Sequence, residues 1–205
     1  MIIRKLVVGA WRANCYILGS EKTKQGLIID PGDGEGKILS AVKELGLDIK
    51  LLVATHGHID HIGAIGEIKK ALGASVAIHE KDSTALQGDG CFFWGMPYGP
   101  PLYPDRTLED GDNIDVSDLH FKVINTPGHT YGGICLYGMG TLFTGDTLFH
   151  NGIGSSGIGT GTHSQLINSI IDKLMVLPPE TIVYPGHGSQ TTIEIERSSN
   201  RYIHW

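Results

Sequence analysis

The sequence lacks long apolar runs, thiol pairs and clusters of basic residues. No apolar run approaches the roughly 20 residues that a membrane-spanning helix needs, so we expect no contact with a membrane. The three cysteines, Cys15, Cys91 and Cys135, are far apart and form no CxxC pair, which favours bland or buried thiols over disulfides or a thiolate zinc site. The net charge is −6 and no run of Lys or Arg occurs, which disfavours a nucleic acid partner and favours a small uncharged or acidic molecule as substrate.

The length and composition indicate a single α/β domain over residues 1–205, with 40% hydrophobic and 19% charged residues. The N-terminal residues 1–8 resemble a strand and carry no signal-peptide pattern, so we expect a cytoplasmic protein, either a monomer or a homodimer. The 29 glycines occur in short clusters, which indicates many tight turns. The 10 histidines are about twice the usual share, and their positions carry the functional argument.

Strand and helix patterns alternate through both halves of the chain. Strands are predicted over residues 2–8, 13–18, 26–29, 50–54, 75–78, 113–116, 119–124, 134–137, 141–143 and 180–184. Helices are predicted over 35–45, 62–72, from a capping box at 162–165 to about 174, and over 191–199. Mixed strands followed by helices, twice over, predict two sheets packed face to face with helices outside.

Two further segments have the composition of functional loops. From Gln87 to Asp105 the chain is rich in Gly, Pro and aromatic residues, typical of either an active-site lid or a packing surface for a second subunit. From Gly152 to Gly161 it is rich in glycine. His150 and His163 flank this second loop, and we expect an ordinary loop residue and a first-turn helix residue there. The remaining histidines, His79, His120 and His204, match no ligand pattern and are expected to be structural or at the surface.

The strongest chemical signal is an HxHxDH motif just beyond the predicted strand 50–54. His56, His58, Asp60 and His61 lie within six residues, and side chains at this spacing can converge where a strand opens into a loop. Gly57 permits the tight backbone. Imidazoles and a carboxylate are ligands for divalent zinc, iron or manganese.

Three more candidate ligands each follow a predicted strand and a turn residue: His129, Asp146 and His187. Each is a weak signal alone. Together with the HxHxDH motif they make seven candidates, a number that fits two metal ions sharing a bridging carboxylate and a bridging water. Asp30, at a strand end before Pro31, is expected to support the site as a turn-fixing residue and not as a ligand.

These motifs resemble those of the metallo-β-lactamase fold superfamily, and within it the glyoxalase II-like hydrolases. The likeness spans nearly the whole chain, including residues 14–16, 29–32, 56–61, 126–130, 145–146, 185–188 and 191–193. It implies an αββα sandwich. It assigns His56, His58 and His129 to a first metal, Asp60, His61 and His187 to a second, and Asp146 to both. Asp60 is then also the carboxylate that orients a hydroxide and shuttles its proton.

The chain departs from the family pattern at two places. Only 18 residues follow His187, where full-length glutathione-thioester hydrolases add a helical region, so the chain is similar to the short, hydroxyacylglutathione hydrolase-like subgroup. Relatives often have Gly-Ile-Gly-Arg-x-Asp after the bridging Asp, and this chain has Gly-Ile-Gly-Ser-Ser-Gly at residues 152–157. The missing Arg and Asp change the polar wall of the site and weaken the expectation of a glutathione thioester.

The sequence therefore predicts a binuclear hydrolase of a thioester, ester or lactone, in which a metal-bridging hydroxide attacks the carbonyl. Two zinc ions are the expected cofactors, with iron or manganese as alternatives. A mononuclear iron, persulfide dioxygenase-like oxidoreductase is the alternative from another enzyme class. A nuclease is disfavoured by the acidic charge, and a non-catalytic metal-stabilised module is disfavoured by the long aromatic loop, which suggests a pocket.

Overall fold

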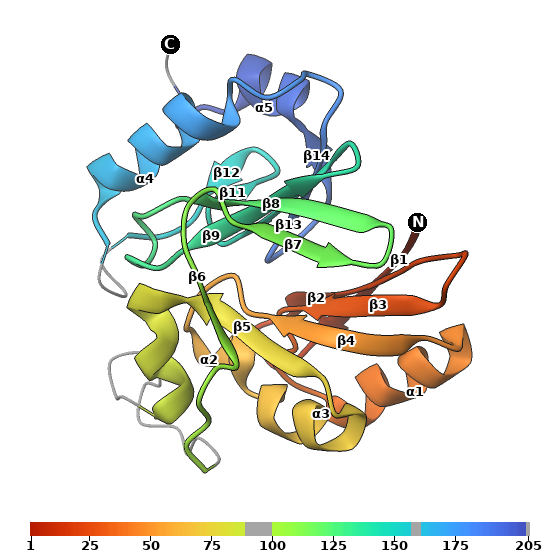
Figure 1. The fold of residues 1–205 in the computed structure, drawn as a ribbon. Helices are drawn as coiled ribbons and strands as arrows, with labels where there is room; N and C mark the ends of the chain where they lie inside the picture. The colour runs from red at the N-terminus through yellow and green to blue at the C-terminus, as the bar shows by residue number, and fades with distance from the viewer. Residues whose placement is uncertain (89–99, 157–160, 204–205) are drawn as a thin grey trace.

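Two mixed sheets of six strands each lie face to face, and helices cover the outer side of both (Figure 1). The computed structural model describes residues 1–88, 100–156 and 161–203. The αββα sandwich implied by the sequence is therefore confirmed. Within these residues, no helix is both long and apolar enough to cross a membrane.

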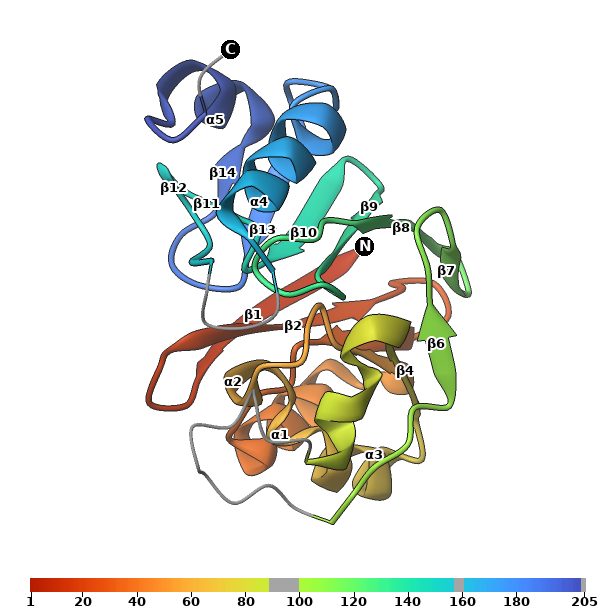
Figure 2. The ribbon, with the colours of Figure 1, turned by 90° about the vertical axis from the view of Figure 1, so that its left-hand side faces the viewer.

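The first sheet comes from the N-terminal half of the chain. In spatial order its strands are β1 (Ile2–Val8), β2 (Ala13–Gly19), β3 (Gln25–Ile29), β4 (Asp48–Val53), β5 (Ser75–His79) and β6 (Arg106–Leu108). The first three pair antiparallel, and β3 to β6 pair parallel. Its outer face is covered by α1 (Glu35–Leu45), α2 (Ile59–Ile62) and α3 (Ile65–Leu72) (Figure 2).

The second sheet comes from the C-terminal half. In spatial order its strands are β14 (Thr191–Thr192), β13 (Ile182–Pro185), β10 (Thr141–Gly145), β9 (Ile134–Gly138), β8 (Leu119–Asn125) and β7 (Asn113–Val116). Only β10 and β13 pair parallel among these strands. Its outer face carries α4 (His163–Ser169), a π-helical turn (Ile170–Leu174) and α5 (Ile193–Ser199) (Figure 1).

Strand β2 contributes alternate side chains to two hydrophobic cores, one on each face of the first sheet. All of its residues are buried, and successive side chains of a strand point to opposite faces. Cys15 and Ile17 pack under the helices of the first sheet, whereas Tyr16 and Leu18 pack between the sheets. The Tyr16 ring meets the ring of Phe143 from the second sheet, with centroids 5.2 Å apart. These contacts hold the two sheets face to face.

The helix predicted over residues 62–72 is wrong in one respect, because it is two helices separated at Gly63. A Cβ on Gly63 would lie 2.5 Å from the Gly32 carbonyl oxygen, and the Ala64 amide donates to the Pro31 carbonyl. The chain therefore bends to pack on the turn at residues 30–32. As a result α2 begins inside the HxHxDH motif, at Ile59.

The other differences are short elements. Residues 191–192 pair with β13, so the last helix begins at Ile193, and the strand predicted over 180–184 runs over Ile182–Pro185. The 3-10 helix η1 (Glu80–Gln87), β6 and the hairpin β11 (Leu148–Phe149) with β12 (Gly152–Ile153) were not predicted. The strands β6, β11 and β12 have only two or three residues each, too few to show a periodicity. The capping box at 162–165 is confirmed, with Thr162 and Gln165 bonding reciprocally.

The two predicted functional loops are described only in part. Residues 89–99 and 157–160, which include Cys91 and most of the predicted loop aromatics, lie outside the described residues. Of those aromatics Tyr103 is described, and it is 68% exposed.

A matched pair of glycine substitutions tests the packing of residues 30–32 against the motif. A Cβ on Gly32 would lie 1.5 Å from the Asp60 carbonyl oxygen, whereas a Cβ on Gly36 in α1 would meet nothing within 4 Å. We expect Gly32→Ala to lower the free energy of unfolding by roughly 1–3 kcal/mol, through overpacking. Gly36→Ala should raise it by up to about 1 kcal/mol, through helix propensity. Urea unfolding measures both, and equal stabilities would contradict the described packing.

Candidate metal centre

The seven predicted ligands come together from five separate segments of the chain. His56 and His58 lie in the loop after β4, and Asp60 and His61 are in α2. The other three come from the second sheet: His129 from the turn between β8 and β9, Asp146 directly after β10, and His187 after β13. Because strands of both sheets end at this place, residues more than 100 positions apart become neighbours.

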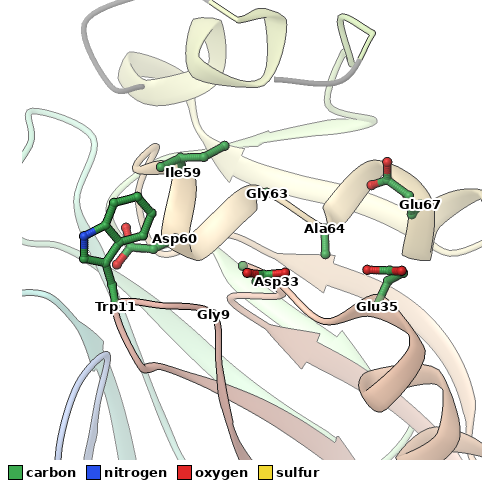
Figure 3. Close-up of a pocket in the computed structure, with 10 residues that line it drawn as sticks. Gly9, Trp11, Asp33, Glu35, Ile59, Asp60, Gly63, Ala64 and Glu67 are labelled. Carbon is green, nitrogen blue, oxygen red and sulfur yellow. The ribbon is translucent and has the colours of Figure 1, made fainter. Parts of the chain in front are cut away.

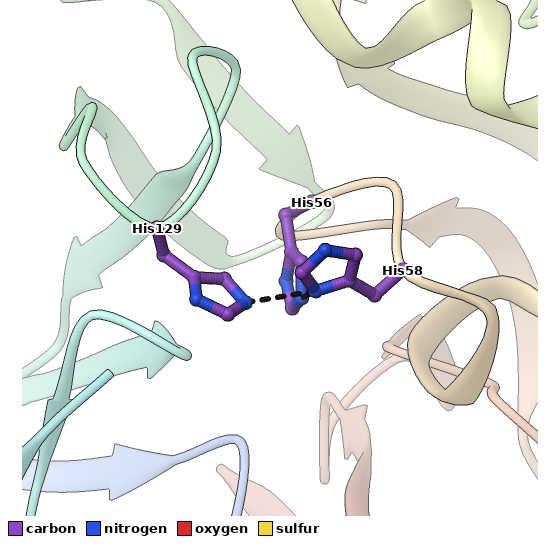
Figure 4. Close-up of side chains that lie close together, drawn as sticks. All are labelled: His56, His58 and His129. Carbon is purple, nitrogen blue, oxygen red and sulfur yellow. Dashed lines mark hydrogen bonds between the residues drawn. The ribbon is translucent and has the colours of Figure 1, made fainter. Parts of the chain in front are cut away.

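The first cluster consists of His56, His58 and His129, whose imidazoles point toward one another (Figure 4). The Nδ1 atom of His58 lies 2.8 Å from Nε2 of His129 and 3.1 Å from Nε2 of His56. Burial, together with the neighbouring histidines, lowers the pKa of His58 to about 4 and that of His56 well below its usual value. These two imidazoles are therefore neutral near pH 7 and can offer a lone pair to a metal ion.

The second cluster consists of Asp60, His61 and His187. Nε2 of His187 lies 3.2 Å from the Asp60 carboxylate and 3.3 Å from Nε2 of His61. Burial alone would lower the pKa of His61, but the carboxylates of Asp146, Asp30 and Asp60 raise it to about 10.

The charges of the other two members follow from the same contacts. Burial alone would lower the pKa of His187, but its hydrogen bond to Asp60 and the Asp146 charge raise it. Burial alone would raise the pKa of Asp60, yet the hydrogen bond to His187 and the charge of His61 bring it down to about 2. Without a metal this cluster therefore holds the cationic His61 against carboxylates, in contrast to the neutral His56 and His58 of the first cluster.

Asp146 lies between the two clusters. One carboxylate oxygen is 3.5 Å from Nε2 of His61, and the other is 3.6 Å from Nε2 of His129 and 3.5 Å from Nε2 of His187. The oxygen that faces His61 is buried without a hydrogen-bond partner. Such an atom is costly to bury unless a ligand compensates it. The donor set and this unsatisfied oxygen both fit divalent metal ions.

Groups outside the clusters fix how the imidazoles are oriented. Both oxygens of Asp30 accept hydrogen bonds from Thr55, and one lies 2.9 Å from Nδ1 of His61. The carbonyl of Ser155 lies 2.6 Å from Nδ1 of His129. Because these oxygens only accept hydrogen bonds, the Nδ1 atoms of His61 and His129 carry protons, and the Nε2 atoms of these two rings face the clusters. The predicted supporting role of Asp30 agrees with this geometry.

The motif at residues 14–16 holds the His187 loop. The Asn14 side-chain amide donates to the carbonyls of Pro185 (2.8 Å) and Gly188 (3.0 Å), and the Tyr16 hydroxyl donates to Pro185 at 2.6 Å. The sequence indicated this motif but not its task. These hydrogen bonds depend on the first sheet lying beside the second, and no local sequence pattern predicts that arrangement.

Sequence reasoning missed Asp82, which is fully buried on η1. Its carboxylate accepts hydrogen bonds from the amides of Gly57 and Gly132. Burial raises its pKa, and the Thr130 side chain and these two amides offset part of that effect. The only sequence signal was its position shortly after a predicted strand.

The remaining histidines lie outside the clusters as far as the chain is described. His150 is exposed beside Asn151, and His163 is the exposed first residue of α4. His79 is buried and caps η1, while His120 pairs with Asp115 at the surface. His204 lies outside the described residues. Cys15 and Cys135 are buried free thiols, as predicted.

A cavity of about 320 Å³ borders the second cluster (Figure 3). Asp60 and the half-exposed Trp11 lie at one end of it, and Glu35 and Glu67 lie at the other, with Asp33 between them. Among the described residues, the lining contains four carboxylates and no basic side chain. The cavity is therefore acidic and has one aromatic wall.

Comparisons with known proteins agree with this geometry. The family model described as metallo-beta-lactamase superfamily matches residues 8–187. The hydroxyacylglutathione hydrolase GloC of Haemophilus influenzae is 34% identical, over 99% of this chain and 98% of its own. A solved structure of the BLEG-1 B3 metallo-beta-lactamase has a TM-score of 0.91 at 29% identity, over 98% of this chain and 99% of its own. The di-iron-bound form of TTHA1623 has a TM-score of 0.84 at 30% identity, over 98% of this chain and 100% of its own.

These matches bear out the resemblance drawn from the motifs, including the likeness to short hydroxyacylglutathione hydrolases. The chain belongs to the metallo-beta-lactamase superfamily and is similar, over nearly its whole length, to a hydrolase of that superfamily.

Proposed function

We propose that the protein is a binuclear metal-dependent hydrolase that cleaves a small thioester, ester or lactone. The observation that carries this proposal is the position of Asp146, which has one oxygen near His61 of the second cluster and the other near His129 of the first cluster and His187 of the second. A carboxylate between two histidine-rich clusters is the arrangement that two-metal hydrolases use to share one bridging ligand. The similarity to the hydrolase GloC supports the same activity class.

His56, His58 and His129 would hold the first ion, Asp60, His61 and His187 the second, and Asp146 both. All of these donors are imidazoles or carboxylates, which suit zinc, iron and manganese alike. We propose zinc, with iron as the alternative because a structural relative is described in a di-iron-bound form.

Bound divalent ions supply a hydroxide nucleophile near neutral pH and a positive charge that stabilises the oxyanion of the attacked carbonyl. The protein supplies orientation. Asp60 lies between the second cluster and the cavity, so its carboxylate can accept a hydrogen bond from the attacking water and pass the proton on. Since its pKa of about 2 keeps it ionised, Asp60 acts as a hydrogen-bond acceptor throughout the neutral range.

A mononuclear iron oxidoreductase of the persulfide dioxygenase type would need fewer ligands. The second cluster, with Asp146 turned toward it, favours two ions and hydrolysis. Elemental analysis of the purified protein, with a panel of small thioesters, lactones and persulfides, separates the two functions. About two zinc ions per chain with thioester or lactone cleavage would support the proposal. Iron with oxygen uptake on a persulfide would refute it.

Replacement of Asp146 tests the shared ligand. Asp146→Ala should reduce the metal content from about two ions per chain to one or fewer and lower kcat by roughly 100-fold or more. His120→Ala is the control, because His120 is exposed and its ring pairs with Asp115 at the surface, away from both clusters. Elemental analysis and hydrolysis of the best substrate in the panel measure both effects. Full activity with both metals retained in Asp146→Ala would rule out a bridging role.

The charge states of the clusters predict which ligands release protons on metal binding. His61 has a pKa of about 10 without metal and must lose a proton to become a ligand, whereas His58 is already neutral. We expect His61→Ala to release about one proton fewer per chain than the wild type on metal binding at pH 7, and His58→Ala to release the same number. Calorimetry in buffers of different ionisation enthalpy measures the protons. Equal losses in both variants would contradict the assignment.

The same charges give the metal-free protein a pH-dependent stability. The pKa of His61 is about 10 in the folded protein, against an ordinary value of 6.5, so its ion pairs stabilise the fold fully below about pH 6.5. This stabilisation is lost as the pH rises through 10. The melting temperature of the metal-free protein should therefore fall between pH 7 and 10. His61→Gln should flatten this fall, and an unchanged slope in that variant would contradict the prediction.

The acidic cavity indicates which substrates the site accepts. Its carboxylates repel an anionic group and attract a cationic one, which the Trp11 ring can also contact. The net charge of the chain led us to expect an uncharged or acidic substrate. The lining of the cavity leads us to propose a neutral or cationic substrate instead. This also disfavours glutathione conjugates, which carry carboxylates.

A charge series of substrates tests this specificity. Thioesters with one acyl group and either an ammonium or a carboxylate substituent should differ in kcat/KM by roughly 2- to 10-fold in favour of the cation, because each exposed ion pair contributes about 1 kcal/mol or less. Glu67→Gln should narrow the difference, and added salt should too. Glu180→Gln, an exposed carboxylate outside the cavity, is the control. An equal or reversed preference in the wild type would contradict the proposal.

A further inference from the structure

Asp82, like Asp30, is a buried carboxylate that lies outside the candidate ligand clusters. It is 0% exposed and lies in the first turn of η1, directly after β5. Burying a carboxylate costs several kcal/mol unless hydrogen bonds compensate the charge. The groups that compensate Asp82 therefore show what its position serves.

Two of those groups are backbone amides from different ligand loops. One oxygen of Asp82 accepts from the Gly57 amide at 3.0 Å, and the other accepts from the Gly132 amide at 2.8 Å. Gly57 lies between His56 and His58 in the loop after β4. Gly132 lies in the turn between β8 and β9 that carries His129. A single side chain thus connects a loop of the first sheet to a loop of the second.

Both amides belong to glycines that have no room for a side chain. A Cβ on Gly57 would lie 2.5 Å from the Cβ of Ala85 in η1, and a Cβ on Gly132 would lie 2.5 Å from the Asp82 carboxylate. Neither glycine has a positive φ angle. Glycine is therefore required at these positions by the close approach of the loops to η1, and not by the backbone conformation.

The two loops that Asp82 connects carry the whole first cluster. His58 and His129 come from opposite sides of this connection, and their ring nitrogens lie 2.8 Å apart. A metal site requires its ligands to be held within about 0.5 Å of the productive geometry. A change in the separation of the loops acts directly on that distance.

We propose that Asp82 is a positioning residue that sets the spacing of the first cluster and thereby its affinity for a divalent metal ion. This inference rests on the proposed function in so far as the cluster binds a metal. Asp82 belongs to none of the candidate ligand clusters and does not line the cavity. It acts by accepting hydrogen bonds from the Gly57 and Gly132 amides at the same time.

The first test needs no metal. Asp82→Asn keeps the size of the side chain but leaves one oxygen to accept and an NH₂ group that cannot, so one of the two amides loses its partner. In the metal-free protein we expect amide hydrogen exchange at Gly57 or Gly132 to become about 10-fold faster or more. Glu196→Gln is the matched control, since Glu196 is also fully buried and accepts from the Asn151 amide and from Asn200. It should leave exchange at both glycines unchanged.

The second test measures zinc affinity by competition with a chelator. Asp82→Asn should weaken the tighter zinc step by roughly 10- to 100-fold, as loss of a group that orients ligands does. Gly132→Ala should weaken it as well, because the added methyl displaces the carboxylate from the loop while the charge remains. Glu196→Gln should bind zinc within about twofold of the wild type, even if its melting temperature falls by as much as that of Asp82→Asn.

Two results would overturn this inference. One is unchanged exchange at Gly57 and Gly132 in Asp82→Asn. The other is an equal loss of zinc affinity in Asp82→Asn and Glu196→Gln, which would reduce Asp82 to a general contribution to stability. A wild-type protein that binds no zinc, iron or manganese would refute the proposed function instead, so the two failures are distinguishable.

Discussion

Titratable side chains crowded between two sheets impose the constraint that governs this structure. Of the seven candidate ligands, His56, His58, His61 and His129 are buried and the others are partly buried. Groups of like charge repel each other in a medium of low dielectric constant, and each loses hydration. The two clusters respond differently. In the first, burial keeps the His56 and His58 imidazoles neutral, whereas in the second the cationic His61 is paired with carboxylates.

Stability of such a site requires that something other than the ligands hold the loops in place. Four connections do so, and each joins segments that are remote in the sequence. Asp30 holds Thr55 and His61, Asp82 holds Gly57 and Gly132, the Ser155 carbonyl holds His129, and Asn14 with Tyr16 holds the loop of His187. Hydrogen bonds to backbone atoms dominate these connections. The ligand positions are therefore fixed by the fold before any metal binds, which reduces the ordering that binding must impose.

The sequence predicted the parts of this arrangement that are local. Strands and helices follow from periodicity, and the HxHxDH motif is a dense signal within one loop. The ends of elements were less accurate, as at Gly63, where contact with Gly32 breaks a helix that the apolar pattern would continue. His129, Asp146 and His187 were weak signals one at a time, and only their resemblance to a family pattern made them a set. Asp82 gave only the weak signal of a position shortly after a predicted strand, because its two partners are far from it in the chain and are backbone amides.

Contacts made by backbone atoms do not depend on the side chain at that position, so some residues around the site are free to vary. The loop that begins at Gly152 lacks the Arg and Asp that relatives often have, yet Ser155 still orients His129 because it uses a backbone carbonyl. Any residue at that position offers the same oxygen. Likewise Asp33, Glu35 and Glu67 line the cavity but hold none of the candidate ligands among the contacts described. The side chains of Ser155 and of the cavity can thus change while the backbone contacts that orient the candidate ligands are preserved. A chain can in this way keep the chemistry of its superfamily and still differ from its relatives in substrate.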